Sequence, residues 1–232
     1  KGSLDYVWAT SWGVSTRLMG ALIMTHSDNN GLVLPPNLAP YQVVIVPIYK
    51  GAEQQKQIAQ VALKIKLLLE EKNIRVKFDN RDKFKPGFKF NEYELKGVPI
   101  RIAIGPNDLK KGSVEIARRD NLSKTVISQE EVVSHIDLHL KEIQLALFDK
   151  AKSFREQKIT KVDNFEDFKK ILDKKGGFIS AHWDGTELTE QAIKKETKAT
   201  IRCIPLDFKE ESGKCVYSGK DSNRRVLFAR AY

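Results

Sequence analysis

The pattern of apolar and polar positions predicts alternating strands and helices in the middle of the chain. Residues Gln42–Tyr49 form a β-branched apolar run of strand length, which is typical of a central strand buried on both faces. Over Ala52–Lys72, apolar side chains recur at helical spacing, and glutamine, glutamate and lysine occupy the other positions. The apolar stripe consists of Ile58, Val61, Ala62, Ile65 and Leu68 or Leu69. The sequence therefore predicts a buried strand followed by an amphipathic helix.

Shorter elements of the same kinds follow. We expect a strand over Arg75–Phe78, a short helix or helical turn over Pro86–Leu95, a strand over Ile100–Gly105 closed by a Gly-Pro-Asn-Asp turn, and an alternating edge strand over Gly112–Arg118. A long helix is predicted from near Ser128, where Ser-Gln-Glu-Glu forms an N-cap signature. Its apolar stripe consists of Val133, Ile136, Leu140, Ile143 and Leu147. This order implies an α/β fold with a mixed sheet flanked by helices.

A small third unit is predicted from Phe165 onward. Its expected elements are a first helix, a strand over Phe178–Trp183, a helix over Leu188–Lys198 and short strands over Thr200–Pro205, Cys215–Tyr217 and Arg225–Ala231. Near the other end of the chain, Asp28–Pro40 contains Asn-Asn-Gly, Pro-Pro and Ala-Pro, which predict a turn and an extended connection. We therefore expect domains over residues 1–40, 41–160 and 161–232, the last of them a small α+β domain.

An arginine stands directly before the apolar run Leu18–Thr25. The run contains Gly20, is far shorter than the roughly 20 residues of a membrane span, and predicts a buried strand. An unpaired charge beside a buried strand is costly, so Arg17 should face an anion or a solvated cleft. Phosphate matches the two parallel donors of a guanidinium. Pairing with a carboxylate, or exposure at a helix end, is the alternative.

Composition adds a basic balance to this picture. The 232 residues carry a net charge of +10, with 41% hydrophobic and 30% charged residues. Such an excess of cations favours a polyanionic partner, although basic proteins without one are also common. The sequence has no signal-peptide pattern and no P-loop. Its two cysteines, Cys203 and Cys215, are expected to be reduced thiols of a cytoplasmic protein.

Basic and aromatic residues are interleaved between Asp79 and Arg101. They are Arg81, Lys83, Lys85, Lys89, Lys96 and Arg101 on one side and Phe84, Phe88, Phe90 and Tyr93 on the other. Basic groups bind phosphate, aromatic rings stack on unpaired bases, and a carboxylate such as that of Glu94 can accept hydrogen bonds from a guanine edge. The mixture predicts a single-stranded RNA surface, while each aromatic residue by itself is also compatible with a core position.

Several long sequence words resemble motif 3 of class II aminoacyl-tRNA synthetases, in the form found in prolyl-tRNA synthetases of the archaeal and eukaryote-like type. They are T-S-W-G-x-S-T-R, G-A-L-I-M-T-H and G-L-V-L-P-P-x-L-A-P-x-Q-V-V-I-V-P-I. The resemblance continues through D-N-R-D, P-G-x-K-F, E-L-K-G-V-P-I-R, I-G-P-N-D and R-V-L-F-A-R-A-Y. It covers essentially the whole chain. It implies the end of a class II catalytic antiparallel sheet, then a mixed-sheet anticodon-binding domain, then a small α+β C-terminal domain.

The resemblance also implies roles for individual residues. Arg17 would be the catalytic motif 3 arginine that binds the ATP phosphates. The adenylate site would be lined by Thr10 and Thr16, and the proline end of the pocket by Trp12, Gly13 and His26. The anticodon contacts would come from Arg81, Lys89, Glu94, Lys96 and Arg101. Tyr232 would bring its carboxylate toward the active site, unless the terminus is a disordered tail. Ser27 departs from the pattern, because relatives usually carry glycine there.

Relatives of this type often bind a metal through four cysteines in the last domain. Those positions fall on Asp184, Thr189, Cys215 and Ser218, so that only Cys215 remains. One thiolate cannot provide the closed tetrahedral set of a structural zinc site. We therefore expect no metal, with packing through Trp183, Tyr217 and Phe228 in its place.

The expected function follows from the resemblance. The full-length protein would be a proline–tRNA ligase, which activates proline with ATP and Mg²⁺ and transfers it to tRNA(Pro), acting as a cytoplasmic homodimer with no membrane association. Motifs 1 and 2 would precede Lys1, so this segment alone should be inactive. The alternative is a non-catalytic tRNA-binding paralogue or regulatory module, although retention of motif 3 favours the enzyme.

Overall fold

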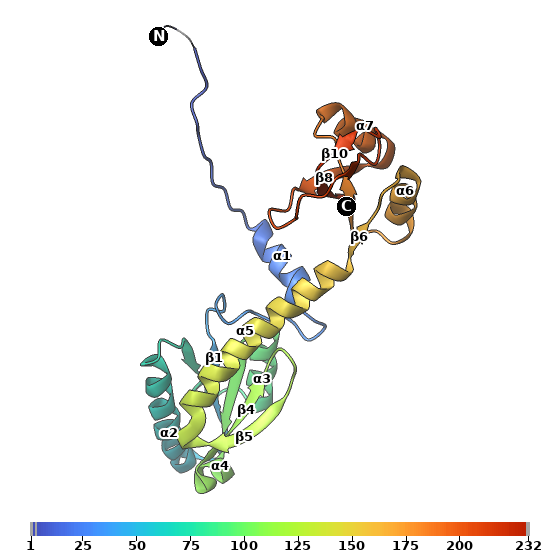
Figure 1. Cartoon of the computed structure of the whole chain (residues 1–232). Helices are drawn as coiled ribbons and strands as arrows, with labels where there is room; N and C mark the ends of the chain where they lie inside the picture. Colours follow the sequence, from blue (N-terminus) through green and yellow to red (C-terminus); the bar gives the residue numbers. More distant parts are fainter. Residues whose placement is uncertain (1, 3, 231–232) are drawn as a thin grey trace. The chain divides into compact units, whose positions relative to one another are not determined.

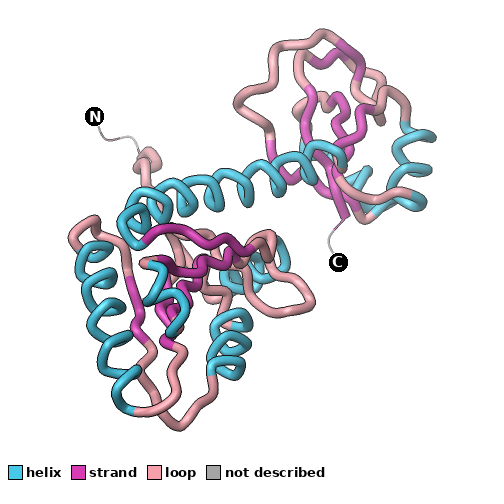
Figure 2. Tube along the Cα trace, turned by 90° about the horizontal axis from the view of Figure 1, so that it is seen from below, coloured by secondary structure: helices cyan, strands magenta, loops and turns pink. Residues whose placement is uncertain are grey.

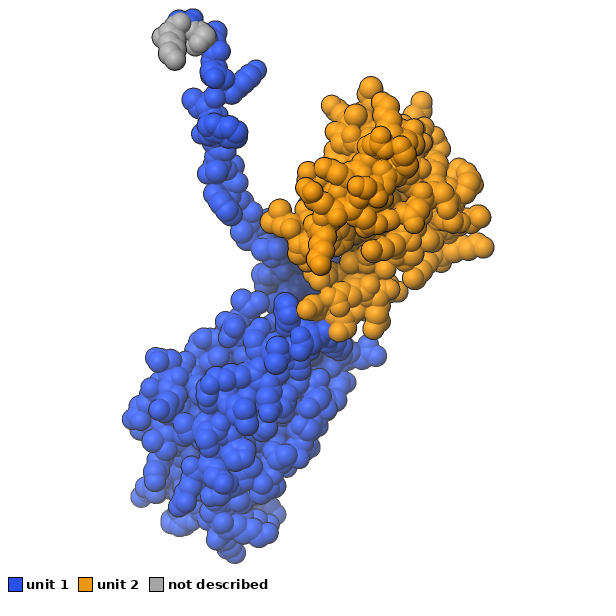
Figure 3. All heavy atoms as spheres, viewed as in Figure 1, with its two compact units in different colours: residues 1–151 blue, residues 152–232 orange. Residues whose placement is uncertain are grey.

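The computed structural model describes residue 2 and residues 4–230, and it divides the chain into two compact units. Unit 1 comprises residues 1–151 and unit 2 residues 152–232. Figure 3 colours the two units blue and orange. The division falls inside the long helix α5 (Val132–Gln157). Each unit has its own hydrophobic core.

Unit 1 contains a five-stranded mixed sheet with the strand order β2-β1-β3-β4-β5. The strands are β1 (Val43–Pro47), β2 (Val76–Phe78), β3 (Ile100–Ile104), β4 (Ser113–Arg118) and β5 (Lys124–Ser128). Strands β2, β1 and β3 run parallel, whereas β4 and β5 join by antiparallel pairing. All five residues of β1 are buried, as its unbroken β-branched run predicts for a central strand.

Helices flank this sheet on both faces, as Figures 1 and 2 show. They are α2 (Ala52–Glu70), α3 (Pro86–Leu95), α4 (Pro106–Lys111), a 3₁₀ turn over Gln129–Glu131, and α5. The apolar stripes of α2 and α5 pack on one face, against Ile100, Ile102 and Ile104 of β3. On the other face, Tyr93 of α3 packs with Val44 and Val46 of β1. The predicted mixed α/β sheet is therefore confirmed.

The buried positions of α2 and α5 differ slightly from the predicted apolar stripes, because the exact rotation of each helix decides which neighbouring residue faces the core. In α2 the buried member of the leucine pair is Leu69, while Leu68 is exposed. In α5 the first buried position is Val132 rather than the predicted Val133, which is half-buried. Ser128 is the N-cap of the preceding 3₁₀ turn, where its Oγ accepts from the Glu130 N–H at 3.3 Å.

Three sequence-based expectations for unit 1 were wrong. Residues Leu18–Thr25 lie in helix α1 (Arg17–His26), which has no buried residue, and are not a buried strand. A short apolar run fits a helix as well as a strand, and leucine, methionine and alanine favour the helix. The Gly-Pro-Asn-Asp segment opens α4, because Pro106 suits a first turn and Asp108 Oδ2 accepts from the Gly105 N–H at 2.9 Å. Strand β4 is internal, because β5 forms the edge beside it.

Unit 2 is a small α+β unit with the strand order β6-β7-β11-β8. Its elements are β6 (Ile159–Lys161), α6 (Phe165–Lys174), β7 (Phe178–His182), α7 (Glu187–Thr197), β8 (Ala199–Cys203), β9 (Gly213–Lys214), β10 (Asp221–Ser222) and β11 (Arg225–Arg230). Aliphatic side chains make up most of its core, and within it Phe168 meets Phe228 edge to face with 5.2 Å between ring centroids. The strand expected at Cys215–Tyr217 is instead part of the turn between β9 and β10, where the Gly219 N–H donates to the Cys215 carbonyl at 3.0 Å.

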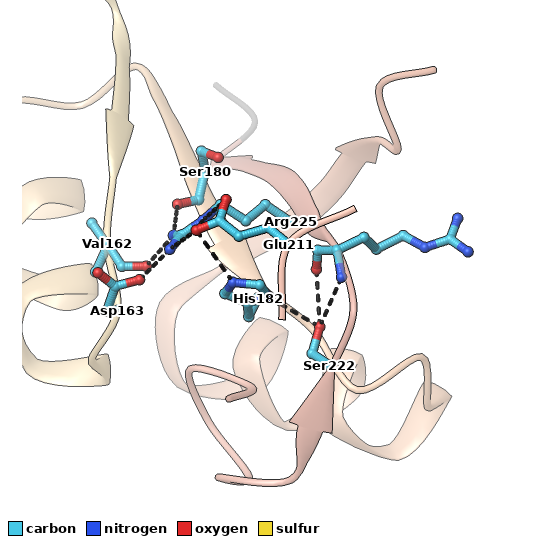
Figure 4. Close-up of polar contacts among 8 residues, drawn as sticks. Val162, Asp163, Ser180, His182, Glu211, Ser222 and Arg225 are labelled. Carbon is cyan, nitrogen blue, oxygen red and sulfur yellow. Dashed lines mark hydrogen bonds and ion pairs between the residues drawn. The ribbon is translucent and has the colours of Figure 1, made fainter. Parts of the chain in front are cut away.

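A buried arginine links the segments of unit 2 (Figure 4). Arg225 is 7% exposed and pairs with Asp163 and with Glu211. Its Nη1 donates to the carbonyls of Val162 at 3.1 Å and Ser180 at 3.3 Å. Charge pairing combined with carbonyl acceptors satisfies a guanidinium in the interior. Through Glu211, the arginine also holds the end of the long connection between β8 and β9.

Candidate nucleic-acid interface

One face of the sheet in unit 1 is open over its antiparallel strands. Alternation along the strands places Arg101 and Ala103 of β3 on the same face as Glu115 of β4 and Val126 of β5, because paired residues share a face. Helix α3 covers this face at β1, yet Val126 is 65% exposed. On this face Ala103 of β3 is buried, Glu115 of β4 is half-buried and Val126 of β5 is exposed, so the surface opens from β3 toward β5.

Arg101 lies on β3, at the enclosed end of this face. Its guanidinium lies over the Phe90 ring, 3.6 Å from the ring centroid, and its Nη2 donates to Glu115 Oε1 at 3.2 Å. Burial lowers the pKa of Arg101, while the neighbouring carboxylates of Glu115 and Glu94 raise it. Within the part of the chain that the structure describes, the buried Nη1 atom has no hydrogen-bond partner. Buried donors are normally satisfied, so this N–H is available to a ligand.

A pocket of about 360 Å³ surrounds Arg101. Its lining combines aromatic and apolar side chains with a carboxylate and basic groups; among them are Phe90, Glu94, Arg101, Arg119 and Lys124. This mixture can stack a planar base, contact its polar edge and attract its phosphate. The arrangement is suited to single-stranded RNA.

A network of charged residues joins the segment before α3 to the helix itself and to the residue that follows it. Asp79, which is 1% exposed, accepts from Arg81 Nε at 2.9 Å and from Arg81 Nη2 at 2.7 Å. Lys89, 2% exposed, donates to the Asp79 carbonyl at 3.0 Å and lies 3.6 Å from its Oδ1. Glu92 pairs with Arg81 and with Lys96, each at 2.5 Å. Burial raises the pKa of Asp79, but the hydrogen bonds from Arg81 and the charge of Lys89 lower it to about 2.

The five residues proposed to contact an anticodon fall into three settings. Glu94 and Arg101 line the same pocket. Arg81 and Lys96 line a larger groove of about 1170 Å³, which also includes Leu22 of α1. The Lys89 side chain is enclosed and engaged with Asp79. The structure therefore brings two of the five together in one pocket and uses Lys89 as an internal counterion.

Sequence reasoning missed several members of the site, among them three charged residues. Glu115, Arg119 and Lys124 reach it from β4 and β5 or the turn that joins them. Glu115 is the diagonal neighbour of Arg101 across the β3–β4 ladder. This neighbour can be identified only when the register of the two strands is known. The sequence did contain one indication of Glu115: it is a charged residue in the alternating segment 112–118, on the face that was expected to meet water.

Apart from His26, the described residues that are predicted to bind ATP and proline are exposed. Thr10, Trp12, Gly13 and Thr16 precede α1 in a segment without regular secondary structure, and Trp12 is 93% exposed. Arg17 begins α1 with an exposed side chain, which suits a phosphate ligand. The described residues place no second wall around it, so they do not by themselves form a closed nucleotide site. The predicted carboxylate of Tyr232 lies outside the described residues.

His26 ends α1 and is half-buried. Burial lowers the pKa of His26, and the charge of Lys150 lowers it further. Its imidazole is therefore biased toward the neutral form at physiological pH.

The positions that correspond to metal-binding cysteines do not fit zinc. Asp184 Oδ2 accepts from Thr189 Oγ1 at 2.8 Å and from Ser218 Oγ at 2.7 Å, and its Oδ1 accepts from Thr186. Burial raises the pKa of Asp184, but these hydrogen bonds lower it to about 2. Hydroxyl groups that donate to a carboxylate cannot replace the thiolates or imidazoles of a tetrahedral zinc site. In residues 2 and 4–230, no group of three His, Cys, Asp or Glu side chains could hold a metal ion.

The three aromatic residues expected to replace the metal each pack against a different neighbour. Phe228 is fully buried, and the Tyr217 ring meets Phe165 edge to face at 4.9 Å between centroids. The Trp183 indole N–H donates to the carbonyl of Thr186 at 3.1 Å. A carboxylate with three hydroxyl donors therefore joins the end of β7, the start of α7 and the β9–β10 turn.

No helix among the described residues is long and apolar enough to cross a membrane.

Comparison with known proteins identifies both units. Residues 42–137 match the family model of the anticodon binding domain, and residues 165–232 match that of the prolyl-tRNA synthetase C-terminal domain. The proline–tRNA ligases of Christiangramia forsetii, Flavobacterium johnsoniae and Cytophaga hutchinsonii are 63%, 62% and 59% identical over 232 residues. These alignments cover 100% of this chain and 47% of each relative, so the chain spans about half the length of the curated relatives that it matches. The chain therefore belongs to the prolyl-tRNA synthetase family and corresponds to its C-terminal portion.

Proposed function

We propose that this chain is the tRNA-binding portion of a proline–tRNA ligase and reads the anticodon on the open face of β3–β5. The observation that carries this proposal is the pocket in which Arg101 lies over Phe90 and retains a buried N–H without a partner among the described residues. The relatives named proline–tRNA ligase support the identity of the substrate tRNA.

The chemistry of the pocket supports guanine recognition, and proline anticodons end in two guanines. Guanine presents two acceptors on one edge and N–H donors on another. Arg101 can donate to the acceptors, while the carboxylate of Glu94 can accept from the donors. Phe90 provides an aromatic surface and Lys124 a cation for the backbone phosphate. Arg81 and Lys96, in the adjacent groove, would extend the contact along the RNA.

In the full-length protein, Arg17 would act at the ATP phosphates. A guanidinium remains protonated throughout and counters the negative charge that develops as pyrophosphate leaves. Thr10 and Thr16 would line the adenylate, and Trp12, Gly13 and His26 the proline end. Tyr232 would bring its carboxylate near this site. ATP would supply the activating phosphoanhydride and Mg²⁺ would neutralise its charge, in a cytoplasmic homodimer.

The test is a binding measurement with this chain and two transcripts of a proline tRNA at matched moderate salt. One transcript carries the native anticodon and the other has both guanines changed. The native transcript should bind more tightly by about 1–3 kcal/mol per altered base. Glu94→Gln and Arg101→Ala should reduce this difference, because each removes a contact to a base edge.

Glu71→Gln provides the matched control. Glu71 is an exposed glutamate at the end of α2, away from the pocket lining, and its variant should keep the wild-type preference. Equal and steeply salt-dependent binding of both transcripts by the wild-type chain would contradict anticodon reading.

A further inference from the structure

The connection between α1 and β1 is fastened to the C-terminal end of α3. The Leu32 N–H donates to the Leu95 carbonyl at 3.0 Å, and the Leu34 N–H donates to the Gly97 carbonyl at 3.3 Å. Gly31 and Gly97 permit this approach, because a Cβ on either would lie 2.6 Å from the opposing backbone. Both glycines also have positive φ angles, of +130° and +70°. The contact is therefore made backbone to backbone.

Arg119 closes the same junction from the sheet. Its Nη1 and Nη2 donate to the two carboxylate oxygens of Asp28 at 2.8 and 2.6 Å, and its Nε donates to the Glu94 carbonyl at 2.9 Å. The residue is 4% exposed. The hydrogen bond from Arg119 lowers the pKa of Asp28 to about 2, so the pair stays ionised at physiological pH. A paired guanidinium in this fork geometry fixes both direction and distance.

These contacts connect two sites of the proposed function. Glu94 contributes its side chain to the candidate anticodon pocket and its carbonyl to Arg119. Asp28 follows Ser27, the C-cap of α1, and α1 begins with Arg17. The route from the pocket to α1 thus passes through one helix end, one buried guanidinium and one carboxylate, all within unit 1.

We propose that Arg119 is a positioning residue that couples occupation of the anticodon pocket to the placement of α1 and its Arg17. This inference rests on the proposed function. A base that binds Glu94 shifts or stiffens the end of α3, and the fork of Arg119 transmits this restraint to Asp28. Arg119 also lines the candidate anticodon pocket, but it touches no reacting group, so its removal should lower kcat through the lost restraint on α1, whereas loss of a direct RNA contact alone would raise KM.

The experiment uses the full-length protein that contains this chain. It measures tRNA-independent proline activation, by pyrophosphate exchange, and the kcat/KM of aminoacylation with the native and the anticodon-changed transcripts. In Arg119→Ala, activation should stay within about twofold of wild type. Charging of the native transcript should fall at least tenfold, mainly in kcat, while charging of the changed transcript stays nearly the same. The ratio of kcat/KM for the native transcript to kcat/KM for the changed transcript should therefore fall at least tenfold toward one.

Three further variants separate coupling from folding. Asp28→Asn removes the charge at a half-exposed position and should shift the ratio in the same direction. Arg119→Lys keeps the charge without the planar fork and should give an intermediate ratio. Arg224→Ala removes an exposed arginine in unit 2 and should behave like wild type.

Two results would overturn the proposal. One is a wild-type ratio in Arg119→Ala and Asp28→Asn. The other is a parallel loss of activation and charging, which would mean a purely structural role. If the wild-type enzyme does not distinguish the transcripts, anticodon reading is refuted. The coupling proposal is then refuted as well, because it rests on anticodon reading.

Discussion

At the scale of single residues, the enclosed charges of unit 1 decide which basic side chains face outward. The sequence alone predicts Lys89 as an RNA contact as readily as Arg81 or Arg101, because all belong to one mixed basic and aromatic segment. In the fold, Lys89 is 2% exposed beside Asp79, whose carboxylate also receives two hydrogen bonds from Arg81. An enclosed lysine is tolerated when an anion compensates it. Asp79 is therefore the residue on which this part of the site depends.

The pairing of Asp79 predicts a specific pH dependence. Because the folded-state pKa of Asp79 is about 2, below its ordinary value of 3.8, its stabilising contribution is complete above about pH 4 and lost as the pH falls toward 2. From pH 4 to pH 2, the unfolding free energy of wild type should fall by about 2 kcal/mol more than that of Asp79→Asn. Urea unfolding at a series of pH values measures this difference.

Asp149→Asn serves as the comparison, because Asp149 is an exposed aspartate on α5. Its curve should run parallel to wild type over the same interval. A constant gap between wild type and Asp79→Asn from pH 4 to pH 2 would show that Asp79 is not held ionised by its partners.

At the scale of elements, some helices and strands are set by local sequence pattern, whereas other segments are set by pairing with distant parts of the chain. Strand β1 and helix α3 lie where their patterns predict them, because an unbroken β-branched run and a helix opened by Pro86 are strong local signals. The run Leu18–Thr25 carries no such signal, and it is an exposed helix. The segment after it is ordered by backbone pairing with α3 through Gly31 and Gly97, a pairing of residues distant in sequence.

The close approach at Gly97 predicts an asymmetry between two glycines. Gly97 and Gly112 have similar φ angles, of +70° and +62°, but a Cβ at Gly97 would meet the backbone of Leu32 at 2.6 Å, whereas at Gly112 it would meet nothing within 4 Å. Both substitutions by alanine carry the left-handed strain of about 1 kcal/mol. Gly97→Ala should cost about 1–3 kcal/mol more, since the backbone must also move. Urea unfolding of the two variants gives the comparison, and equal losses would mean that the linker is not held against α3.

At the scale of the whole molecule, the net charge of +10 sets a background attraction to RNA that carries no sequence information. Specific recognition must come from the few groups in the pocket, among which Lys124 is an exposed cation on β5 and Arg101 an enclosed one on β3. These two cations should therefore affect binding in different ways.

Salt titration separates the two contributions. Lys124→Ala should weaken binding of the native and the anticodon-changed transcripts equally and reduce the slope of log K against log salt by about one, because one phosphate contact is lost. Lys209→Ala, a change in the exposed β8–β9 connection, should leave the slope unchanged. An altered preference between the transcripts in Lys124→Ala would mean that Lys124 reads a base and does not simply hold phosphate.

The sequence by itself determined the order of the main strands and helices, the mixed α/β class and the family, because periodicity and long ordered words are local properties. It also singled out Glu94 and Arg101. Only the tertiary structure decided that Lys89 is enclosed, that Glu115 stands beside Arg101, and that Arg119 joins Asp28 to the end of α3. These outcomes depend on strand register and on contacts between distant segments. A side chain's partner across a sheet or a linker is not encoded in the spacing of its own neighbours, and burial, which sets the cost of each charge, exists only once the chain has folded.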